Sequence, residues 1–190
     1  TSDREAALAL AREHAWLMAS EVLATGLDLS FAPVVDLGRG NLAIGNRAFH
    51  AEPGIVADFC RAYVAGLHEA GMAATIKHFP GHGSSTADSH EGFVDITQSW
   101  SASELDPYGA LIAENLADMV MVGHLYHADF AGQGSVKLPA SLSPDWIDGV
   151  LRSKLGFAGV VITDDLEMGA IREHYSLEET VVRAVTAGVD

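Results

Sequence analysis

The chain has 190 residues, of which 48% are hydrophobic and 19% charged, and this composition excludes an intrinsically disordered protein. Its 26 acidic residues outnumber its 11 lysines and arginines, and the net charge of −15 excludes nucleic acid or an anionic membrane as the main partner. No run reaches the roughly 18 to 20 apolar residues that a membrane span needs. The single cysteine, Cys60, excludes an intrachain disulfide, and its apolar helical surroundings predict a buried structural thiol.

Helical and extended apolar patterns alternate along the whole sequence. The predicted elements are, in chain order, a helix at 6–25, a strand at 27–35, a helix at 53–70, a strand at 73–76, a helix from 104, a strand at 118–122, a helix at 143–155, a strand at 159–163 and a helix at 177–187. The last residues, 187–190, have the pattern of a helix C-cap followed by the start of another strand.

The predicted strands are nearly continuous apolar runs, which indicates burial on both faces and therefore a parallel sheet. Long segments follow the strands, at 36–52, 77–103 and 123–143, and this favours a TIM-type (β/α)8 barrel with its site at the C-terminal ends of the strands. A doubly wound open sheet is the alternative. Because four strands and the start of a fifth cannot close a barrel, we expect an incomplete fragment with about four to five βα units. Residues 1–190 are thus predicted to be a single catalytic barrel domain, truncated at both ends.

Ionisable side chains stand at the ends of several predicted strands, where a barrel would bring them into one cavity. They are Asp36, Lys77 with His78, His124, and Asp164 with Asp165. Asp164 has the chemistry of a nucleophile, a general base or a metal ligand, and either acid of the pair is also suited to capping the turn that follows. Asp165 is the better capping candidate.

The stretch from Lys77 to His90 holds more proton-transferring groups than any other. Asp88 precedes His90 by two residues, so its carboxylate is placed to accept the imidazole N–H and to favour the imidazolium. This arrangement would keep a proton available for acid catalysis, although the same spacing is typical of a solvated Asx turn.

The other polar residues leave both structural and functional interpretations open. Lys77 and His78 need a partner or a ligand at the end of a buried strand, and structural pairing with Asp36 would satisfy them. Arg47 is suited to point into the cavity or to form a surface salt bridge. His82 fits a hydrogen-bonding role within the loop better than a catalytic one, and His124 fits either.

Six segments together resemble the family 3 glycoside hydrolases, in particular their bacterial β-N-acetylglucosaminidase branch. The resemblance spans essentially the whole chain, through residues 31–36, 44–49, 77–83, 87–90, 138–143 and 162–168. The run Lys-His-Phe-Pro-Gly-His-Gly with Asp-Ser-His downstream is its most specific part.

The resemblance implies a retaining double displacement. Asp164 would attack the anomeric carbon, and His90, polarised by Asp88, would protonate the leaving oxygen and then activate water. A second set of residues, Arg47, Lys77 and His78, would hydrogen-bond the terminal sugar. The substrate would be a small carbohydrate, a muropeptide or a chitooligosaccharide, cleaved without a metal or cofactor. A cytoplasmic enzyme is expected, with export as the alternative.

Two departures from the family pattern limit these expectations. The family carries a substrate-binding aspartate in an Asp-Gln-Glu-Gly-Gly segment that does not occur here, so an incomplete sugar site is expected. The residues Ser84-Ser85-Thr86 also differ from the common ones, which leaves the aglycone open. The alternative functions are a β-N-acetylglucosaminide phosphorylase, a β-glucosidase, a metal-dependent barrel hydrolase and a non-catalytic sugar-binding relative.

Overall fold

A computed structural model describes residues 2–85, 87–89, 91–131 and 137–190 and shows an α/β chain. The α-helices are α1 (Ser2–Leu23), α2 (Pro53–Ala70), α3 (Asp106–Ala113), α4 (Gly169–Arg172) and α5 (Leu177–Thr186). The strands are β1 (Leu29–Ser30), β2 (Ala73–Phe79), β3 (Val94–Asp95), β4 (Met119–Val122), β5 (Leu125–Tyr126) and β6 (Val160–Thr163). Short 3-10 turns η1 (Gly45–Arg47), η2 (Ala102–Leu105), η3 (Ala128–Phe130) and η4 (Ala140–Leu142) and the π-helix η5 (Asp145–Lys154) complete the described elements.

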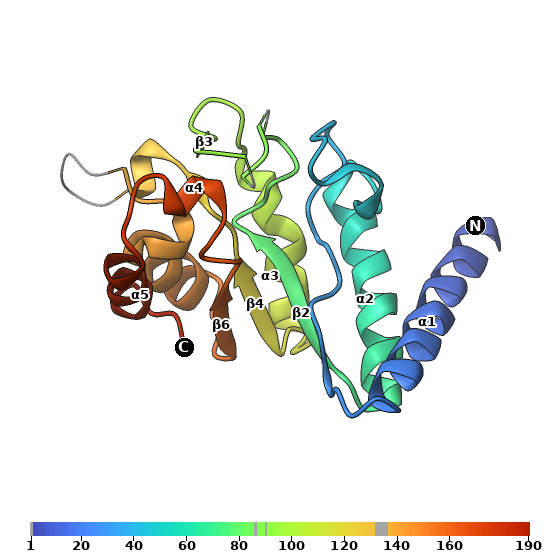
Figure 1. Cartoon of the computed structure of the whole chain (residues 1–190). Coiled ribbons are helices and arrows are strands. Elements are labelled where there is room, and N and C mark those ends of the chain that lie inside the picture. The colour runs from blue at the N-terminus through green and yellow to red at the C-terminus, as the bar shows by residue number, and fades with distance from the viewer. Residues whose placement is uncertain (1, 86, 90, 132–136) are drawn as a thin grey trace.

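The main sheet is parallel and has the strand order β1-β2-β4-β6, the same order as in the chain. Successive helices pack against each other, α1 on α2 and α2 on α3, beside this sheet (Figure 1). A doubly wound sheet would reverse its strand order and carry helices on both faces, so that alternative is wrong. The uninterrupted winding is that of a (β/α)8 barrel, and the predicted incomplete barrel is confirmed.

The first predicted strand is much shorter than expected. Its regular part covers only Leu29–Ser30, and beyond it Val34 makes one isolated bridge to Lys77. Pro33 lies between these parts, and proline has no N–H to donate to a ladder. The segment nevertheless stays beside β2, because the carbonyls of Ala32 and Pro33 accept the backbone N–H groups of Thr75 and Lys77.

The second strand is longer than predicted, because β2 continues to Phe79 and so includes Lys77 and His78. Its pairing with β4 is irregular between Lys77 and Phe79. A small parallel pair, β3 with β5, lies beyond the C-terminal ends of the main strands and was not predicted. Two-residue strands leave no periodic pattern in a sequence, which explains the omission.

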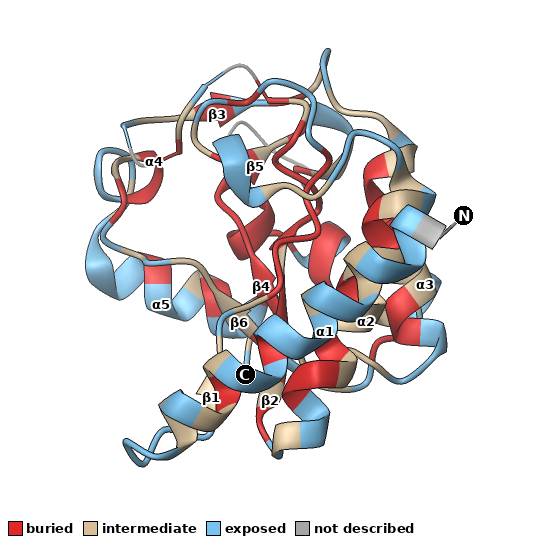
Figure 2. Cartoon of the chain, turned by 90° about the vertical axis from the view of Figure 1, so that its right-hand side faces the viewer, coloured by how far each residue is buried: buried red, intermediate tan, exposed pale blue. Residues whose placement is uncertain are grey.

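The core lies between the sheet and its helices, as the buried residues along β2 and β4 in Figure 2 show. Phe79, Tyr108 and Trp146 are fully buried there, with Phe79 edge-on to both other rings. Cys60 is free and fully buried, which confirms the structural thiol, and burial raises the pKa of that thiol.

Exposed apolar side chains concentrate on the first and last helices. Those on α1 and α5 are Leu10, Trp16, Leu17, Leu177, Val181, Val182 and Val185. Among the described residues, no helix combines the length and the apolar character required to cross a bilayer.

Candidate active site

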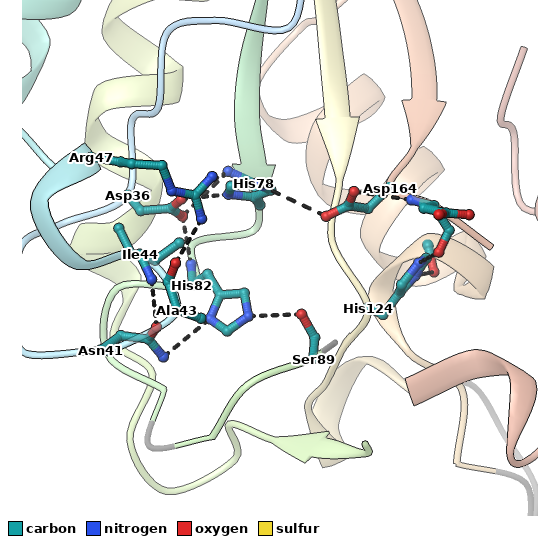
Figure 3. A network of polar contacts seen from close by, with 12 residues as sticks. Asp36, Asn41, Ala43, Ile44, Arg47, His78, His82, Ser89, His124 and Asp164 are labelled. Atoms are coloured by element: carbon teal, nitrogen blue, oxygen red, sulfur yellow. Dashed lines mark hydrogen bonds and ion pairs between the residues drawn. The ribbon is translucent and has the colours of Figure 1, made fainter. Parts of the chain in front are cut away.

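The candidate site lies at the C-terminal ends of β2, β4 and β6, where the following segments gather at the top of Figure 1. Figure 3 shows that His78 from β2 points towards Asp164, which follows β6, and that Asp36 approaches His78 from the other side. Parallel strands end at one edge of a sheet, and this brings together groups that are more than 80 residues apart in sequence.

Asp36 is fully buried and holds two histidines in place, His78 of β2 and His82 of the loop that follows. Its Oδ2 lies 2.7 Å from Nδ1 of His78, and its Oδ1 accepts the backbone N–H of His82 at 2.7 Å. The backbone N–H of His78 also points to this carboxylate, at 3.2 Å from Oδ2. Burial opposes the charge of Asp36, but His78 and the hydrogen bonds outweigh burial, so the pKa of Asp36 is lowered. The structural partner of Asp36 is therefore His78 rather than Lys77.

Asp164 stands at the open side of the site, and its side chain is 21% exposed. Its Oδ2 lies 3.9 Å from Nε2 of His78, and its Oδ1 accepts the backbone N–H of Asp165 at 3.0 Å. The backbone N–H of Asp164 donates to the carbonyl of Val122 at 2.9 Å, which fixes the residue to β4. The carboxylate is thus held firmly while its oxygen remains accessible.

Asp165 has a different environment, although it is the next residue. Its side chain is exposed, and its Oδ1 accepts the backbone N–H of Glu167 at 2.9 Å. This is the turn-capping geometry that was predicted for the second acid of the pair.

Lys77 and Arg47 supply positive charge around His78. Lys77 is half-buried, and burial lowers its pKa, as does Arg47, while the Asp164 carboxylate opposes that shift. Arg47 is exposed on η1 and its guanidinium donates to the carbonyl of Ala43 at 2.8 Å (Figure 3). Arg47 thus lies beside Asp36 and His78, and the charge of Lys77 acts on both Arg47 and Asp164.

The loop after β2 is organised by the buried imidazole of His82. Its Nε2 lies 3.0 Å from the hydroxyl of Ser89, and its Nδ1 lies 2.7 Å from the hydroxyl of Ser85. Burial lowers the pKa of His82, so the neutral ring is favoured. The predicted role of His82 as a hydrogen-bonding residue of the loop is confirmed. Asp88, next to Ser89, is half-buried, whereas His90 lies outside the described residues.

His124 has a partner at each ring nitrogen. Nδ1 lies 2.7 Å from the hydroxyl of Ser141, and Nε2 lies 2.9 Å from the backbone carbonyl of Asp165. Its Nε2–H therefore donates to the segment that follows Asp164, and its contacts support that segment.

Sequence reasoning missed Glu104, which is fully buried in η2 below the loop. The hydroxyl of Ser84 donates to its Oε1, while its Oε2 is one of the buried polar atoms without a hydrogen-bond partner among the described residues. Burial raises the pKa of this carboxyl. Gly81 lies directly against it, since a Cβ at Gly81 would be 2.5 Å from Cβ of Glu104. The position of Glu104 at the start of a predicted helix gave no sign of this burial.

A cleft of about 770 Å³ opens beside these groups, between the segment after β1 and the loop after β2. It is lined by Arg39, Gly40, Asn41, Leu42, Ala43, Ser84, Ser85, Ala87, Asp88, Glu91, Gly92 and Phe93. Asp88 therefore faces this cleft, whereas Asp164 lies outside it.

In the part of the chain that the structure describes, no three His, Cys, Asp or Glu residues are grouped as metal ligands would be.

Comparisons with known proteins match these features. The model of the glycosyl hydrolase family 3 N-terminal domain matches residues 1–190. A beta-hexosaminidase of Xylella fastidiosa (strain 9a5c) is 51% identical over 191 residues, covering 99% of this chain and 55% of the relative. A beta-hexosaminidase of Stenotrophomonas maltophilia (strain K279a) is 50% identical over 192 residues, covering 100% and 56%. The chain thus spans about half the length of these curated relatives.

Solved structures with the same fold are also similar in sequence. A family 3 β-N-acetylglucosaminidase from Paenibacillus sp. str. FPU-7 superposes with a TM-score of 0.89 at 40% identity, over 96% of this chain and 35% of that one. NagZ from Neisseria gonorrhoeae, in complex with N-trifluoroacetyl-D-glucosamine, superposes with a TM-score of 0.85 at 35% identity, over 98% and 52%.

Proposed function

The chain belongs to glycosyl hydrolase family 3, and from this premise we propose that it carries the catalytic machinery of a retaining glycosidase that releases terminal β-linked N-acetylglucosamine. Residues 1–190 would form part of a single catalytic (β/α)8 barrel domain. β1 and β6 are the edge strands of the described sheet, and Asp190 already pairs with Val161 of β6. This pairing and the exposed apolar residues of α1 and α5 support a barrel that continues beyond these elements.

The observation that carries the proposal is the environment of Asp164. Its carboxylate is partly exposed at the end of β6, close to His78 and under the influence of the Lys77 charge. A nucleophilic carboxylate has to be reachable, and the partial exposure of Asp164 supports this condition. In the proposed first step, an Asp164 oxygen bonds to the anomeric carbon while the bond to the leaving oxygen breaks, which gives a covalent glycosyl–enzyme intermediate.

His90 would act as the general acid and base, with Asp88 as its partner. It would give its proton to the leaving oxygen and then take a proton from the water that releases the sugar from Asp164. Most retaining glycosidases use a second carboxyl group for this task. A histidine is neutral after proton donation, so it adds no second anion beside Asp164.

The terminal sugar would be held by Arg47, Lys77 and His78. The contact between Asp36 and Nδ1 of His78 supports this role, because it fixes the ring and directs Nε2 towards Asp164. Lys77 would add a charged donor from the neighbouring position of β2.

The names of the relatives support an amino sugar as the substrate, and the proposed substrates are muropeptides or chitooligosaccharides. The net charge of −15 supports the expectation that nucleic acid is not a partner.

A cytoplasmic location belongs to the same proposal. Immunoblotting of cytoplasmic and envelope fractions tests it, and recovery in the envelope would overturn it.

The decisive experiment compares two aryl substrates with the full-length protein in phosphate-free buffer. An aryl N-acetyl-β-glucosaminide should be turned over far better than the matching β-glucoside. Preference for the glucoside would keep the family but overturn the substrate. Turnover of the acetamido sugar only after phosphate is added would make the enzyme a phosphorylase, and no turnover of either would argue for sugar binding without catalysis.

A further inference from the structure

The buried side chains around His82 form a continuous hydrogen-bonded brace inside the loop that carries Asp88. His82, Ser85 and Ser89 are at most 4% exposed, and the amide of Asn41 joins them from the segment after β1 (Figure 3). Groups this deeply buried keep their hydrogen bonds because water cannot replace a lost partner.

The partners of Asn41 fix the orientation of its side-chain amide. Its Oδ1 accepts the backbone N–H of Ile44 at 2.9 Å, so its Nδ2 must be the donor to the carbonyls of Ser85 at 2.9 Å and Ala87 at 3.2 Å. Nδ2 also lies 3.4 Å from Nδ1 of His82, which joins the imidazole to the same group of contacts.

Each ring nitrogen of His82 has a serine hydroxyl as its partner. Nδ1 lies 2.7 Å from the hydroxyl of Ser85, and Nε2 lies 3.0 Å from the hydroxyl of Ser89. The neutral ring of His82 thus contacts the loop at Ser85 and at Ser89, on either side of Ala87 and Asp88.

Ser89 extends the brace to the other side of the site. Its backbone carbonyl accepts the N–H of Ala170 at 3.3 Å, and Ala170 belongs to α4, which follows Asp164 and Asp165. The chain of contacts consequently runs from the loop of Asp88 to the segment of Asp164 through one residue.

We propose that His82 is a positioning residue, which acts through Ser85 and Ser89 to hold the carboxylate of Asp88 at a fixed place relative to Asp164. The inference rests on the proposed function, since Asp88 would there be the partner of the acid–base residue. His82 itself would touch neither substrate nor reacting atoms. Its loss should weaken protonation of the leaving group and leave attack by Asp164 largely intact.

The first test measures how the effect of a variant depends on the leaving group, using the full-length protein. His82→Gln and Ser89→Ala should lower kcat/KM for a disaccharide of N-acetylglucosamine about ten-fold more than for its 4-nitrophenyl glycoside, which needs little acid assistance. His68→Gln and Ser176→Ala are matched controls, since both residues make one side-chain hydrogen bond far from the site. Equal losses on both substrates would overturn the proposal.

The second test needs no turnover. Hydrogen exchange followed by mass spectrometry should show the peptide that contains Ala170 exchanging about five-fold faster in His82→Ala than in the unsubstituted protein, with no change in the controls. Unchanged exchange would overturn the brace even in an active enzyme. If the unsubstituted protein cleaves neither substrate, the proposed function fails, and the exchange experiment still decides whether His82 joins the two segments.

Discussion

Nε2 of His78 lies 3.9 Å from Oδ2 of Asp164, although His78 belongs to β2 and Asp164 follows β6. The strand β4 lies between β2 and β6. The contact therefore crosses the C-terminal end of β4 and does not join two adjacent strands. The other nitrogen of His78 is held by Asp36 at 2.7 Å. The site is therefore built around a fixed imidazole, with the proposed nucleophile beside it.

Replacing Asp164 should separate catalysis from folding. We expect Asp164→Ala to lower turnover by on the order of 10⁴-fold or more, because the variant lacks the proposed nucleophile. The free energy of unfolding should change by only about 1 kcal/mol, since the side chain is partly exposed and makes one backbone hydrogen bond. Steady-state kinetics and urea unfolding measure both quantities. Asp165→Asn is the control and should remain active. Normal turnover by Asp164→Ala would exclude Asp164 as the nucleophile.

Replacing His90 should reveal the acid step through the choice of substrate. His90→Ala should reduce kcat/KM by about 10²-fold or more for a natural glycoside, because general acid catalysis typically contributes this much. The loss should be much smaller for an aryl glycoside, whose leaving group departs without protonation. The exposed His14 provides the matched control, His14→Ala. Equal losses on both substrates would argue against an acid role for His90.

Replacing Asp36 should change the pH dependence of stability. The pKa of Asp36 is lowered below its ordinary value of 3.8, so its ionised form contributes stability above that pH, and this contribution is lost as the pH falls through the lower folded pKa. Asp36→Asn should therefore reduce the free energy of unfolding by about 3 kcal/mol near neutral pH and by progressively less below pH 3.8.

Urea unfolding at several pH values tests the effect of Asp36→Asn. The control is Asp95→Asn, because Asp95 also accepts a backbone hydrogen bond but is exposed. Its substitution should cost less than about 1 kcal/mol at any pH. A difference for Asp36→Asn that stays constant into the acid range would show that the charge of Asp36 contributes no stability.

Replacing Lys77 tests its proposed contact with the sugar. Lys77→Met keeps the length of the side chain and removes the charge, and we expect kcat/KM to fall by about 10²-fold through a lost charged hydrogen bond. The free energy of unfolding should change by about 1 kcal/mol or less, since burial already disfavours the ammonium and lowers the pKa of Lys77. The exposed Lys154 supplies the control, Lys154→Met, which should keep full activity. An unchanged KM and kcat for Lys77→Met would remove Lys77 from the binding site.

Gly81 should be intolerant of any side chain. It has φ +114°, and a Cβ would lie 2.5 Å from Cβ of Glu104, so Gly81→Ala is expected to cost about 3 kcal/mol of stability. Gly26 has a similar φ of +89° but no atom within 4 Å of its Cβ position, and Gly26→Ala should cost only about 1 kcal/mol. Thermal or urea unfolding of both variants isolates the contact with Glu104. Equal losses of stability in Gly81→Ala and Gly26→Ala would show that the side chain of Glu104 can move aside.

The sequence by itself determined the type and order of the main elements and the edge at which the site lies. Apolar periodicity depends on local side-chain order, so α2, β4 and β6 could be predicted to within a residue or two. The rule that parallel strands end at one edge then placed His78 and Asp164 at the same end of the sheet.

Only the tertiary structure decided which polar groups are partners. Asp36 binds His78 rather than Lys77, Glu104 is buried against Gly81, and His82 joins Ser85 to Ser89. Such pairings depend on the exact separation of segments distant in the chain, to within about the length of one hydrogen bond. Hydrophobic patterns fix which face of an element is buried, but they do not set distances of that precision between elements.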